Sequence, residues 1–267
     1  MARRRRVGAN QLSLFVPEES AWVPWPRGEL LGFDLETTGV DRFSDVPVSF
    51  ALTTWRAGVV VDSSTHLIDP GREIPEGASA IHGISTERAR REGWPLGEAV
   101  ELIADRLVEA SRRGVPVTGI KLDYDLTMLD VQCRALDGRG LDRRGWTGPV
   151  FDALVLDRRL ARYRRGRRTL GHLCAHYGVA ISQAHDALAD AEASIGVLLA
   201  MSRRFPELFG ADPVELFSAQ VGWHREWTIS YDAWRRQDGQ TPLDPRESIW
   251  PVAPQALDTE DETAGAA

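Results

Sequence analysis

Two carboxylates, Asp34 and Glu36, lie in an apolar stretch that runs from Leu30 to Gly39. The alternation of the stretch and its terminal glycine predict a buried strand that closes in a turn. Side chains alternate across a strand, so both acids point to the same side. Neighbouring carboxylates in such a strand repel each other and lose hydration, and a hard divalent cation between them relieves both effects. A solvated strand end is the alternative, and for an Asp-x-Glu pair taken alone it is the more common explanation.

Two further acids and a histidine could complete such a site. Asp125 opens a helix directly after a predicted strand, where an acid also favours the helix macrodipole. His185 lies at the mouth of a predicted helix over Asp186–Arg204, and Asp190 is expected more than a turn inside that helix. An aspartate that faces inward from a largely apolar helix needs a partner. Four acids on three separate elements, three of them beside apolar neighbours, therefore favour a shared site over solvated surface.

The elements that carry these residues predict an α/β fold with a mixed sheet. Three strands with short links indicate an antiparallel meander: Leu30–Thr37, Val48–Trp55 and Val59–Ile68. A loop is expected from Asp69 to Trp94. Helices and strands then alternate: helix Leu96–Arg113, strand Val115–Gly119, helix Tyr124–Leu136, strand Val150–Phe151, and helices Ala153–Leu160, Leu170–Tyr177 and Asp186–Arg204. This order predicts antiparallel strands first and parallel strands after them, flanked by helices.

Composition shifts divide the chain into four parts. Residues 1–28 are expected to form a flexible arm and residues 29–206 the globular domain. Residues 207–240 predict an amphipathic helical extension that starts at the N-cap Asp212 and ends near Gly239. Its aromatic stripe is expected to pack against the domain or a partner: Leu216, Trp223, Trp227, Tyr231 and Trp234. Residues 241–267 are acidic, and we expect them to be disordered.

Composition also narrows the class of protein. The chain has 43% hydrophobic residues, ample for a core, and a net charge of −7, which argues against a generally basic nucleic-acid coat. The two cysteines, Cys133 and Cys174, show no disulfide or zinc-site spacing. No run approaches the ~18 apolar residues of a membrane span, and no apolar segment follows the basic start. These features predict a cytoplasmic protein without a membrane partner.

The ordered set Asp34-x-Glu36, Asp125 and His185-x4-Asp190 resembles the DEDDh exonuclease family. That family includes the proofreading epsilon subunit of bacterial DNA polymerase III. The resemblance runs from about Leu30 to Phe205, and three stretches support it: Phe33–Gly39, Ile81–Ile84 and Phe151–Leu154. Each motif alone is weak, whereas the ordered set with this spacing is specific. The resemblance implies a ribonuclease H-like fold.

The resemblance also implies a reaction. Asp34, Glu36 and Asp190 would ligate one divalent cation, Mg²⁺ or Mn²⁺, and Asp34 and Asp125 a second one. Two such cations can stabilise both the attacking and the leaving oxygen of an in-line displacement. His185 would be the general base, a task that suits an imidazole with an unperturbed pKa of ~6.5. The product would be a nucleoside 5′-monophosphate released from a 3′ end.

Substrate contacts follow from the same resemblance. The backbone around Leu35 and Thr37 would hold the terminal nucleotide, and His82 would lie near the entering strand. An ordinary loop histidine is an equally good explanation for His82. Lys121 stands where the family usually has an asparagine, four residues before Asp125. Its ammonium group could contact a phosphate, or it could repel a metal and reduce activity.

A run of arginines from 158 to 168 is the strongest basic feature of the chain. A solvated face is the usual explanation for a charge run. Because this run lies between the second and third motifs of an otherwise acidic protein, we expect a phosphate-backbone patch that includes Arg164 and Arg165.

A short apolar island in the arm, residues 11–15, resembles the pentapeptide by which bacterial replication and repair proteins bind the β sliding clamp. Gln11 would be its polar anchor, and the apolar anchors would be Leu12, Leu14 and Phe15. Tethering by such an arm would raise the local enzyme concentration at a primer end towards the millimolar range.

The sequence as a whole predicts metal-dependent 3′→5′ hydrolysis of single-stranded or frayed DNA, in proofreading or repair. Two alternatives stay open. RNA could replace DNA as the substrate, because no residue reveals a contact to a 2′-OH, and only the clamp-like peptide favours DNA. The chain could also be a clamp-tethered nucleic-acid-binding protein with little catalysis, an alternative prompted by Lys121.

Overall fold

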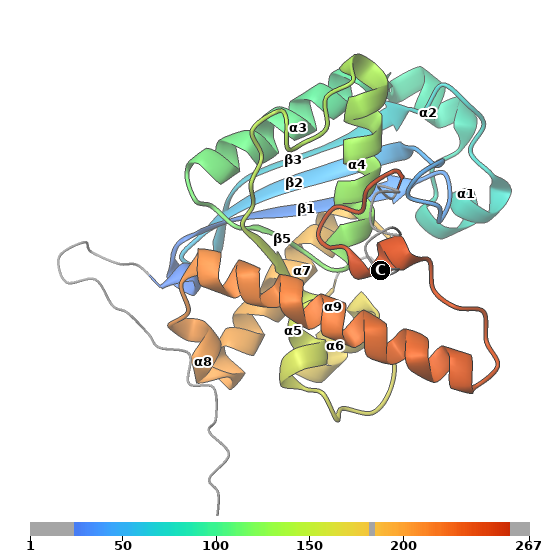
Figure 1. Cartoon of the computed structure of the whole chain (residues 1–267). Coiled ribbons are helices and arrows are strands. Elements are labelled where there is room, and N and C mark those ends of the chain that lie inside the picture. Colours follow the sequence, from blue (N-terminus) through green and yellow to red (C-terminus); the bar gives the residue numbers. More distant parts are fainter. Residues whose placement is uncertain (1–23, 182–184, 257–267) are drawn as a thin grey trace, which may run out of the picture.

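The structure is a computed structural model that describes residues 24–181 and 185–256. Within these ranges six strands form one sheet in the order β4-β3-β2-β1-β5-β6 (Figure 1). The strands are β1 (Glu29–Thr37), β2 (Pro47–Arg56), β3 (Val59–Asp69), β4 (Trp94–Pro95), β5 (Val117–Gly119) and β6 (Val150–Asp152). β1, β2 and β3 pair antiparallel, and β5 and β6 then continue the sheet from β1 in parallel. The predicted mixed sheet is confirmed.

Nine α-helices accompany the sheet in the described ranges. They are α1 (Glu76–His82), α2 (Thr86–Glu92), α3 (Leu96–Arg112), α4 (Leu122–Asp137), α5 (Ala153–Leu160), α6 (Leu170–Tyr177), α7 (Ala187–Arg204), α8 (Pro206–Phe209) and α9 (Pro213–Gln237). A 3-10 turn, η1 (Trp25–Arg27), precedes β1, and a second one, η2 (Pro245–Ser248), follows α9. None of the helices in this part of the chain is long and apolar enough to cross a membrane.

The segment between β3 and α3 was predicted as a loop, and that prediction is wrong. It contains α1, α2 and the short strand β4, which pairs with β3. α1 and α2 have only seven residues each, and α1 buries none of them. Their sequences therefore lack the regularly spaced apolar residues from which a helix is predicted. α2 is fixed instead by a local cap, because the Ser85 side chain accepts a hydrogen bond from the Arg88 amide.

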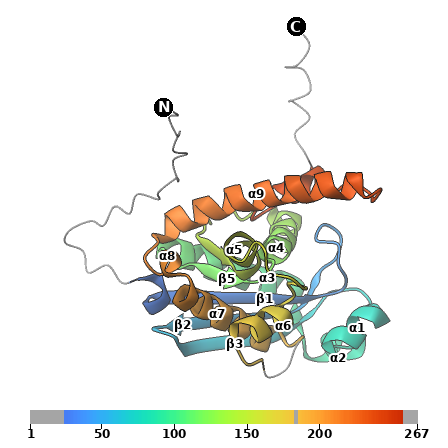
Figure 2. The same ribbon diagram turned by 90° about the horizontal axis from the view of Figure 1, so that it is seen from below.

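The two faces of the sheet are covered by different helices (Figures 1 and 2). Leu31, Phe33 and Leu35 belong to the core cluster that α3 and α4 complete. On the opposite face α7 packs directly on β1 at Gly32, where an added Cβ would lie 2.9 Å from Cδ1 of Ile195. A side chain at this position would push α7 away from the sheet, and Asp34 and Glu36 follow Gly32 on the same face.

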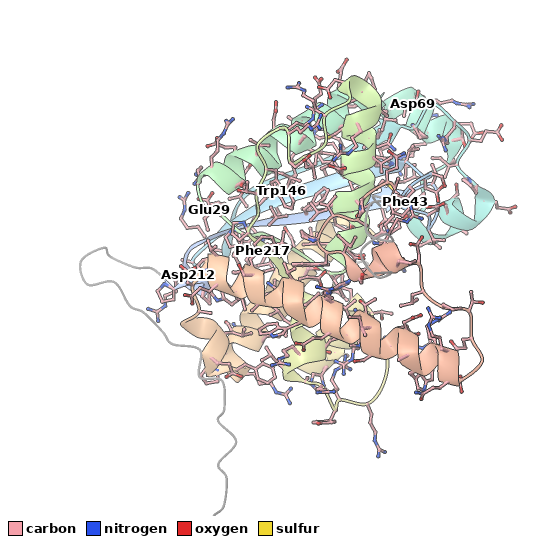
Figure 3. The ribbon with its side chains drawn as sticks, in the orientation of Figure 1. Glu29, Phe43, Asp69, Trp146, Asp212 and Phe217 are labelled. Atoms are coloured by element: carbon pink, nitrogen blue, oxygen red, sulfur yellow. The ribbon has the colours of Figure 1, made fainter. Side chains whose placement is uncertain are left out.

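The extension after the domain begins as predicted, since the Asp212 side chain caps α9 by accepting the amides of Val214 and Glu215. α9 crosses the molecule beside α5 (Figures 1 and 2). Phe217 of α9 joins the main core on the side of Trp146 (Figure 3).

The expected disorder after residue 240 is wrong for residues 241–256. Trp250 is buried against Phe217, with 5.8 Å between the ring centroids, and the Ala253 amide donates to Oγ1 of Thr127. The burial of Trp250 and Ala253 and the hydrogen bond to Thr127 thus anchor a segment whose polar composition suggested disorder. Residues 257–267 lie outside the described ranges.

The expected arm also ends earlier than residue 28. Trp25 is buried and packs edge-to-face on Phe151 of β6, with 5.0 Å between the ring centroids. Residues 1–23, including the clamp-like peptide, lie outside the described ranges.

Candidate active site

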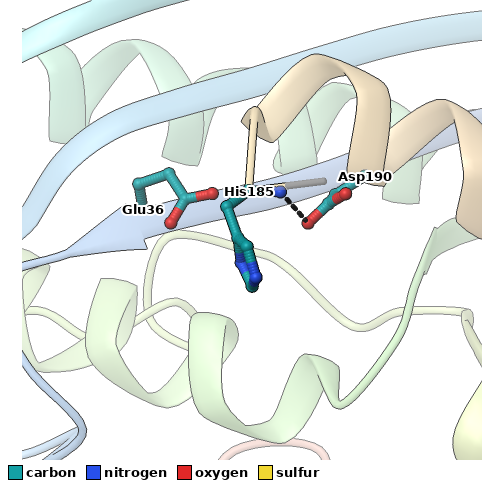
Figure 4. Close-up of side chains that lie close together, drawn as sticks. All are labelled: Glu36, His185 and Asp190. Carbon is teal, nitrogen blue, oxygen red and sulfur yellow. Dashed lines mark hydrogen bonds between the residues drawn. The ribbon is translucent and has the colours of Figure 1, made fainter. Parts of the chain in front are cut away.

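Asp34, Glu36 and Asp190 meet where β1 faces the start of α7. The helix begins at Ala187, with Asp186 as its cap, so Asp190 lies in the first turn. The prediction that Asp190 lies more than a turn inside is therefore wrong. Oδ2 of Asp190 accepts the backbone N–H of His185 at 3.3 Å, which ties the histidine to the helix (Figure 4).

Glu36, His185 and Asp190 form a potential metal-ligand set. One ligand atom from each of the three lies within 4.8 Å of the others. The residues come from β1, from the segment before α7 and from α7 itself (Figure 4). The structure thus brings together residues that are about 150 positions apart in sequence.

Asp125 joins the group from the other side of β1. Its Oδ1 accepts the backbone N–H of Leu35 at 3.1 Å. β5 pairs with β1 only at Leu31 and Gly32, so the Leu35 amide lies beyond the paired region. A buried amide needs an acceptor, and the side chain of α4 supplies it.

Electrostatic interactions confirm that the four acids share one neighbourhood. Burial, and then the charges of Asp125, Asp190 and Glu36, raise the pKa of Asp34 well above its usual range. Burial followed by the charges of Asp190 and Asp186 raises the pKa of Glu36 to about 8. Burial also raises the pKa of Asp125 and of Asp190. Each carboxylate is therefore costly to ionise unless a cation joins the site.

The donor set fits a hard divalent cation. Within the described ranges no lysine or arginine forms an ion pair with any of the four acids. Oδ1 of Asp190 is buried and has no hydrogen-bond partner among the described residues. Carboxylate oxygens are the ligands that Mg²⁺ and Mn²⁺ prefer.

Two residues of the site have left-handed backbone conformations, which are uncommon outside glycine. His185 has φ 65° and an exposed side chain, and it precedes the Asp186 cap. Lys121 has φ 58° and is the N-cap of α4. Such conformations cluster at functional sites and persist where the surroundings hold them.

Near the strand end, a cleft of about 370 Å³ is lined by residues that include Glu36, His82 and His185, whereas the predicted contacts Leu35 and Thr37 are not among its lining residues. Nδ1 of His82 accepts the Ile84 amide at 3.1 Å, whereas its buried Nε2 has no hydrogen-bond partner among the described residues. Burial, and then the charge of His185, lowers the pKa of His82. The structure thus places His82 beside the acids.

Tyr124 is a residue that sequence reasoning missed. Its hydroxyl donates to the Gly39 carbonyl and lies 3.2 Å from Oγ1 of Thr37. Thr37 in turn donates to Gly39 at 2.7 Å. The three groups hold the turn after β1, but no sequence pattern connects a tyrosine on α4 with this turn.

Asp152, in the stretch Phe151–Leu154, holds the starts of two helices. Its carboxylate accepts the amides of Lys121 and Leu122 at 3.1 and 2.9 Å, and the Leu154 amide at 2.7 Å. One buried acid therefore caps both α4 and α5 and holds the left-handed turn at Lys121.

The arginine run does not reach this cleft, and one predicted contact in it is wrong. Arg164 is only 10% exposed and pairs with the buried Asp157 at 3.0 Å. Arg168 pairs with the same carboxylate. Because Asp157 engages Arg164, we do not retain Arg164 as a phosphate contact. Arg165 is exposed.

Comparison with known proteins adds a family match. The family model described as exonuclease, of the RNase T type, matches residues 31–198, a range that includes all four acids and His185. A PolC-type DNA polymerase III of Lacticaseibacillus paracasei is 27% identical over 197 residues, which is 73% of this chain and 13% of the polymerase. A DNA polymerase III subunit epsilon-like protein of Rhodobacter capsulatus is 29% identical, over 72% of this chain and 27% of that protein.

Solved structures share the fold. E. coli exonuclease I in complex with a dA16 oligonucleotide aligns with a TM-score of 0.58 at 22% identity, over 74% of this chain and 44% of that one. Exonuclease I of Methylocaldum szegediense aligns with a TM-score of 0.55 at 24% identity, over 68% of this chain and 42% of that one. The chain therefore spans less than half the length of each of these relatives.

Proposed function

The chain belongs to the exonuclease family, and we propose that it is a metal-dependent 3′→5′ exonuclease that shortens single-stranded or frayed DNA. The observation that carries the proposal is the meeting of Asp34, Glu36, Asp125 and Asp190 around one end of β1, with His185 beside them. Their shared burial and raised pKa values favour a cation-binding role over a solvated acidic surface.

In this proposal the acids hold two cations. Asp34, Glu36 and Asp190 would bind one Mg²⁺ or Mn²⁺, and Asp34 and Asp125 would bind the other. When bound, such cations stabilise the negative charge that develops on oxygens during displacement at phosphorus.

His185 would act as the general base. It is exposed beside Glu36 and Asp190, where it could take a proton from the attacking water. The water oxygen would attack the phosphorus of the last phosphodiester, and the bond from phosphorus to the 3′ oxygen of the preceding nucleotide would break. The products would be a nucleoside 5′-monophosphate and a strand shortened by one nucleotide.

Of the proposed substrate contacts, His82 lines the cleft, whereas Arg165 belongs to the arginine run outside it. The backbone at Leu35 and Thr37 and the side chain of His82 would hold the terminal nucleotide. Lys121 and Arg165 would contact phosphates farther along the strand. The charge of Lys121 partly opposes the rise that burial causes in the pKa of Asp125, so Lys121 would act close to the acids. All four acids and His185 are present in the chain, which favours an active enzyme over a binding protein.

DNA is the favoured substrate because the relatives are named as DNA polymerase III proteins, and exonuclease I binds a deoxyadenosine oligonucleotide. The main alternative is an exoribonuclease that uses the same residues. The role in proofreading or repair, the cytoplasmic location and the clamp contact through residues 11–15 remain part of the proposal.

Digestion of matched single strands tests polarity and substrate. A DNA strand labelled at its 5′ end, and an RNA strand of the same sequence, would be incubated with Mg²⁺, Mn²⁺ or EDTA. We expect a ladder of DNA products that shorten stepwise from the 3′ end, only with a cation. Faster digestion of RNA would support the exoribonuclease, and no digestion of either strand would support the weakly catalytic binding protein.

A further inference from the structure

A hollow of about 270 Å³ lies between α5 with its following loop and α9. Arginines line it from one side and tryptophans from the other: Arg158, Arg159, Arg162 and Arg168 against Trp223 and Trp227. We call this hollow the Arg–Trp pocket. The match to the exonuclease family ends at residue 198, so α9 lies outside the region that the family assigns.

The Arg–Trp pocket has an excess of positive charge. Arg168 is engaged by the buried Asp157, and Arg159 pairs with Glu226 at 3.7 Å. The guanidinium groups of Arg158 and Arg162 form no ion pair or hydrogen bond with any residue in the described ranges. Glu226 is the only acid among the described residues that line the hollow.

Arg158 is the most unusual member of the set. Its guanidinium lies 3.2 Å from the ring centroid of Trp227, and burial lowers its pKa to about 10. The group thus stays charged at neutral pH in a place poor in water. Stacking on an indole offsets part of that cost, and an anion in the hollow would offset more of it.

A second hollow adjoins the Arg–Trp pocket on the side of α4. Arg158 and Trp227 also line a smaller hollow of about 130 Å³, which Lys121 borders from the start of α4. The charge of Lys121 acts on Asp125, one of the four acids. Lys121 and Arg158 thus border one hollow, together with the acids Asp123 and Glu247, and Arg158 also lines the Arg–Trp pocket.

We propose that the Arg–Trp pocket binds single-stranded nucleic acid upstream of the 3′ end that is hydrolysed. The guanidinium groups of Arg159 and Arg162 would contact phosphates, and the ring of Trp223 would stack with a base, whereas Trp227 already stacks with Arg158 and Tyr231. The proposal rests on the proposed exonuclease function only for the direction in which the strand runs. An acidic peptide would leave the ring of Trp223 unused, and a free mononucleotide carries one phosphate for the two exposed guanidinium groups of Arg159 and Arg162.

Binding in EDTA tests the proposal without hydrolysis. Fluorescence anisotropy of a labelled oligo-dT of about twelve nucleotides would be measured against salt concentration, with the full chain. The variant Arg159→Ala/Arg162→Ala removes two exposed side chains, so its fold should be retained. We expect at least about tenfold weaker binding and a salt slope that is smaller by about 0.7 for each phosphate that the variant no longer neutralises.

Two further variants are compared in the same binding measurement. Glu226→Gln removes the one acid and frees Arg159, so we expect binding to become tighter. Arg112→Ala removes the same charge from the end of α3, which does not line the Arg–Trp pocket, and should leave the affinity within about twofold. Unchanged affinity in Arg159→Ala/Arg162→Ala, or weaker binding in Glu226→Gln, would overturn the proposal.

A competition experiment tests whether the Arg–Trp pocket binds a strand or a free mononucleotide. If dTMP displaces the labelled oligonucleotide as well as unlabelled oligo-dT does, at equal nucleotide concentration, the Arg–Trp pocket is a mononucleotide site and the proposal fails. Length-dependent competition that disappears in Arg159→Ala/Arg162→Ala supports the strand. Oligonucleotide binding that depends on the Arg–Trp pocket in a chain that digests nothing would support this inference while contradicting the proposed function.

Discussion

Oδ1 of Asp125 accepts the backbone N–H of Leu35 at 3.1 Å, which ties the acid of α4 to the strand that carries Asp34 and Glu36. The bond spans 90 positions in sequence and is buried. Because the three-residue strand β5 leaves the Leu35 amide unpaired, the interaction both completes the hydrogen bonding of β1 and fixes the position of the second motif.

Crowded acids predict a pH-dependent stability in the absence of metal. The pKa of Glu36 is raised from 4.5 to about 8, first by burial and then by the charges of Asp190 and Asp186. Between these two values the folded protein binds a proton that the unfolded chain releases. The free energy of unfolding should therefore fall as the pH rises from about 4.5 to about 8. Urea denaturation in EDTA across this range measures the fall.

The matched variants for this titration are Glu36→Gln and Glu98→Gln. Glu36→Gln removes the proton that the folded state retains and should flatten the fall, whereas Glu98 is an exposed acid of α3 and should leave it unchanged. A fall of the same size in both variants would show that the acids around β1 are not its source.

Cation binding should reverse this dependence. A divalent cation competes with protons for the carboxylates, so Mn²⁺ should raise the melting temperature more at about pH 8.5 than at about pH 6. Differential scanning fluorimetry with and without Mn²⁺ measures the two shifts. Equal shifts at both pH values would contradict binding through groups whose pKa values are raised.

A buried ion pair connects the turn after β1 to the C-terminal segment. Nη1 of Arg42 lies 2.8 Å from Oδ2 of Asp123, and the same guanidinium pairs with Glu247 at 2.8 Å. Arg42→Ala leaves Asp123 buried without its partner and should lower the free energy of unfolding by about 3 kcal/mol. Arg56→Ala breaks a pair in which the arginine is 62% exposed and should cost less than about 1 kcal/mol. If denaturant titrations gave similar losses of unfolding free energy for Arg42→Ala and Arg56→Ala, the buried ion pair would not stabilise the fold more than the exposed one.

The clamp-like peptide predicts a partner through residues outside the described ranges. Leu14→Ala/Phe15→Ala removes two apolar anchors and should weaken binding to a bacterial β sliding clamp by at least about tenfold. Surface plasmon resonance with the full chain measures this change, and Val7→Ala serves as the control outside the pentapeptide. Equal affinity of both variants would argue against a clamp contact through this peptide.

Most of the fold could be predicted because apolar residues in its central strands and helices recur at the spacing typical of each element. The strand expected over Leu30–Thr37 is β1 with one residue added, and the helix expected over Ala153–Leu160 is α5. The buried face of α3 includes Ile103 and Leu107. By contrast, α1 and α2 bury too few side chains to give a pattern, and β4 exists only through its pairing with β3.

In the candidate site, too, residues in local motifs could be predicted, whereas contacts between distant residues could not. Asp34, Glu36, Asp125, His185 and Asp190 could be found because their motifs are local and ordered, and the structure places them together. The role of Tyr124 and the pairing of Arg164 with Asp157 depend on contacts that no spacing reveals. A charge run gives the number of arginines, but the fold decides which of them have carboxylate partners.

The packing of residues 241–256 could not be predicted for a related reason. Their composition is polar, and the burial of Trp250 depends on Phe217, which α9 delivers from outside the exonuclease match. One apolar side chain in a polar segment carries little pattern, and the contacts that fix this segment, such as those of Trp250 with Phe217 and of Glu247 with Arg42, join residues far apart in sequence.

The rate of mononucleotide release from single-stranded DNA with Mn²⁺, compared between the wild type and Asp34→Asn, tests the central claim most directly. Asp34 is the acid whose pKa responds to the other three, so we expect a loss of at least about a hundredfold without unfolding. Asp62→Asn, at an exposed position of β3, should keep the wild-type rate. Release by Asp34→Asn within about twofold of the wild type would show that hydrolysis does not depend on this site.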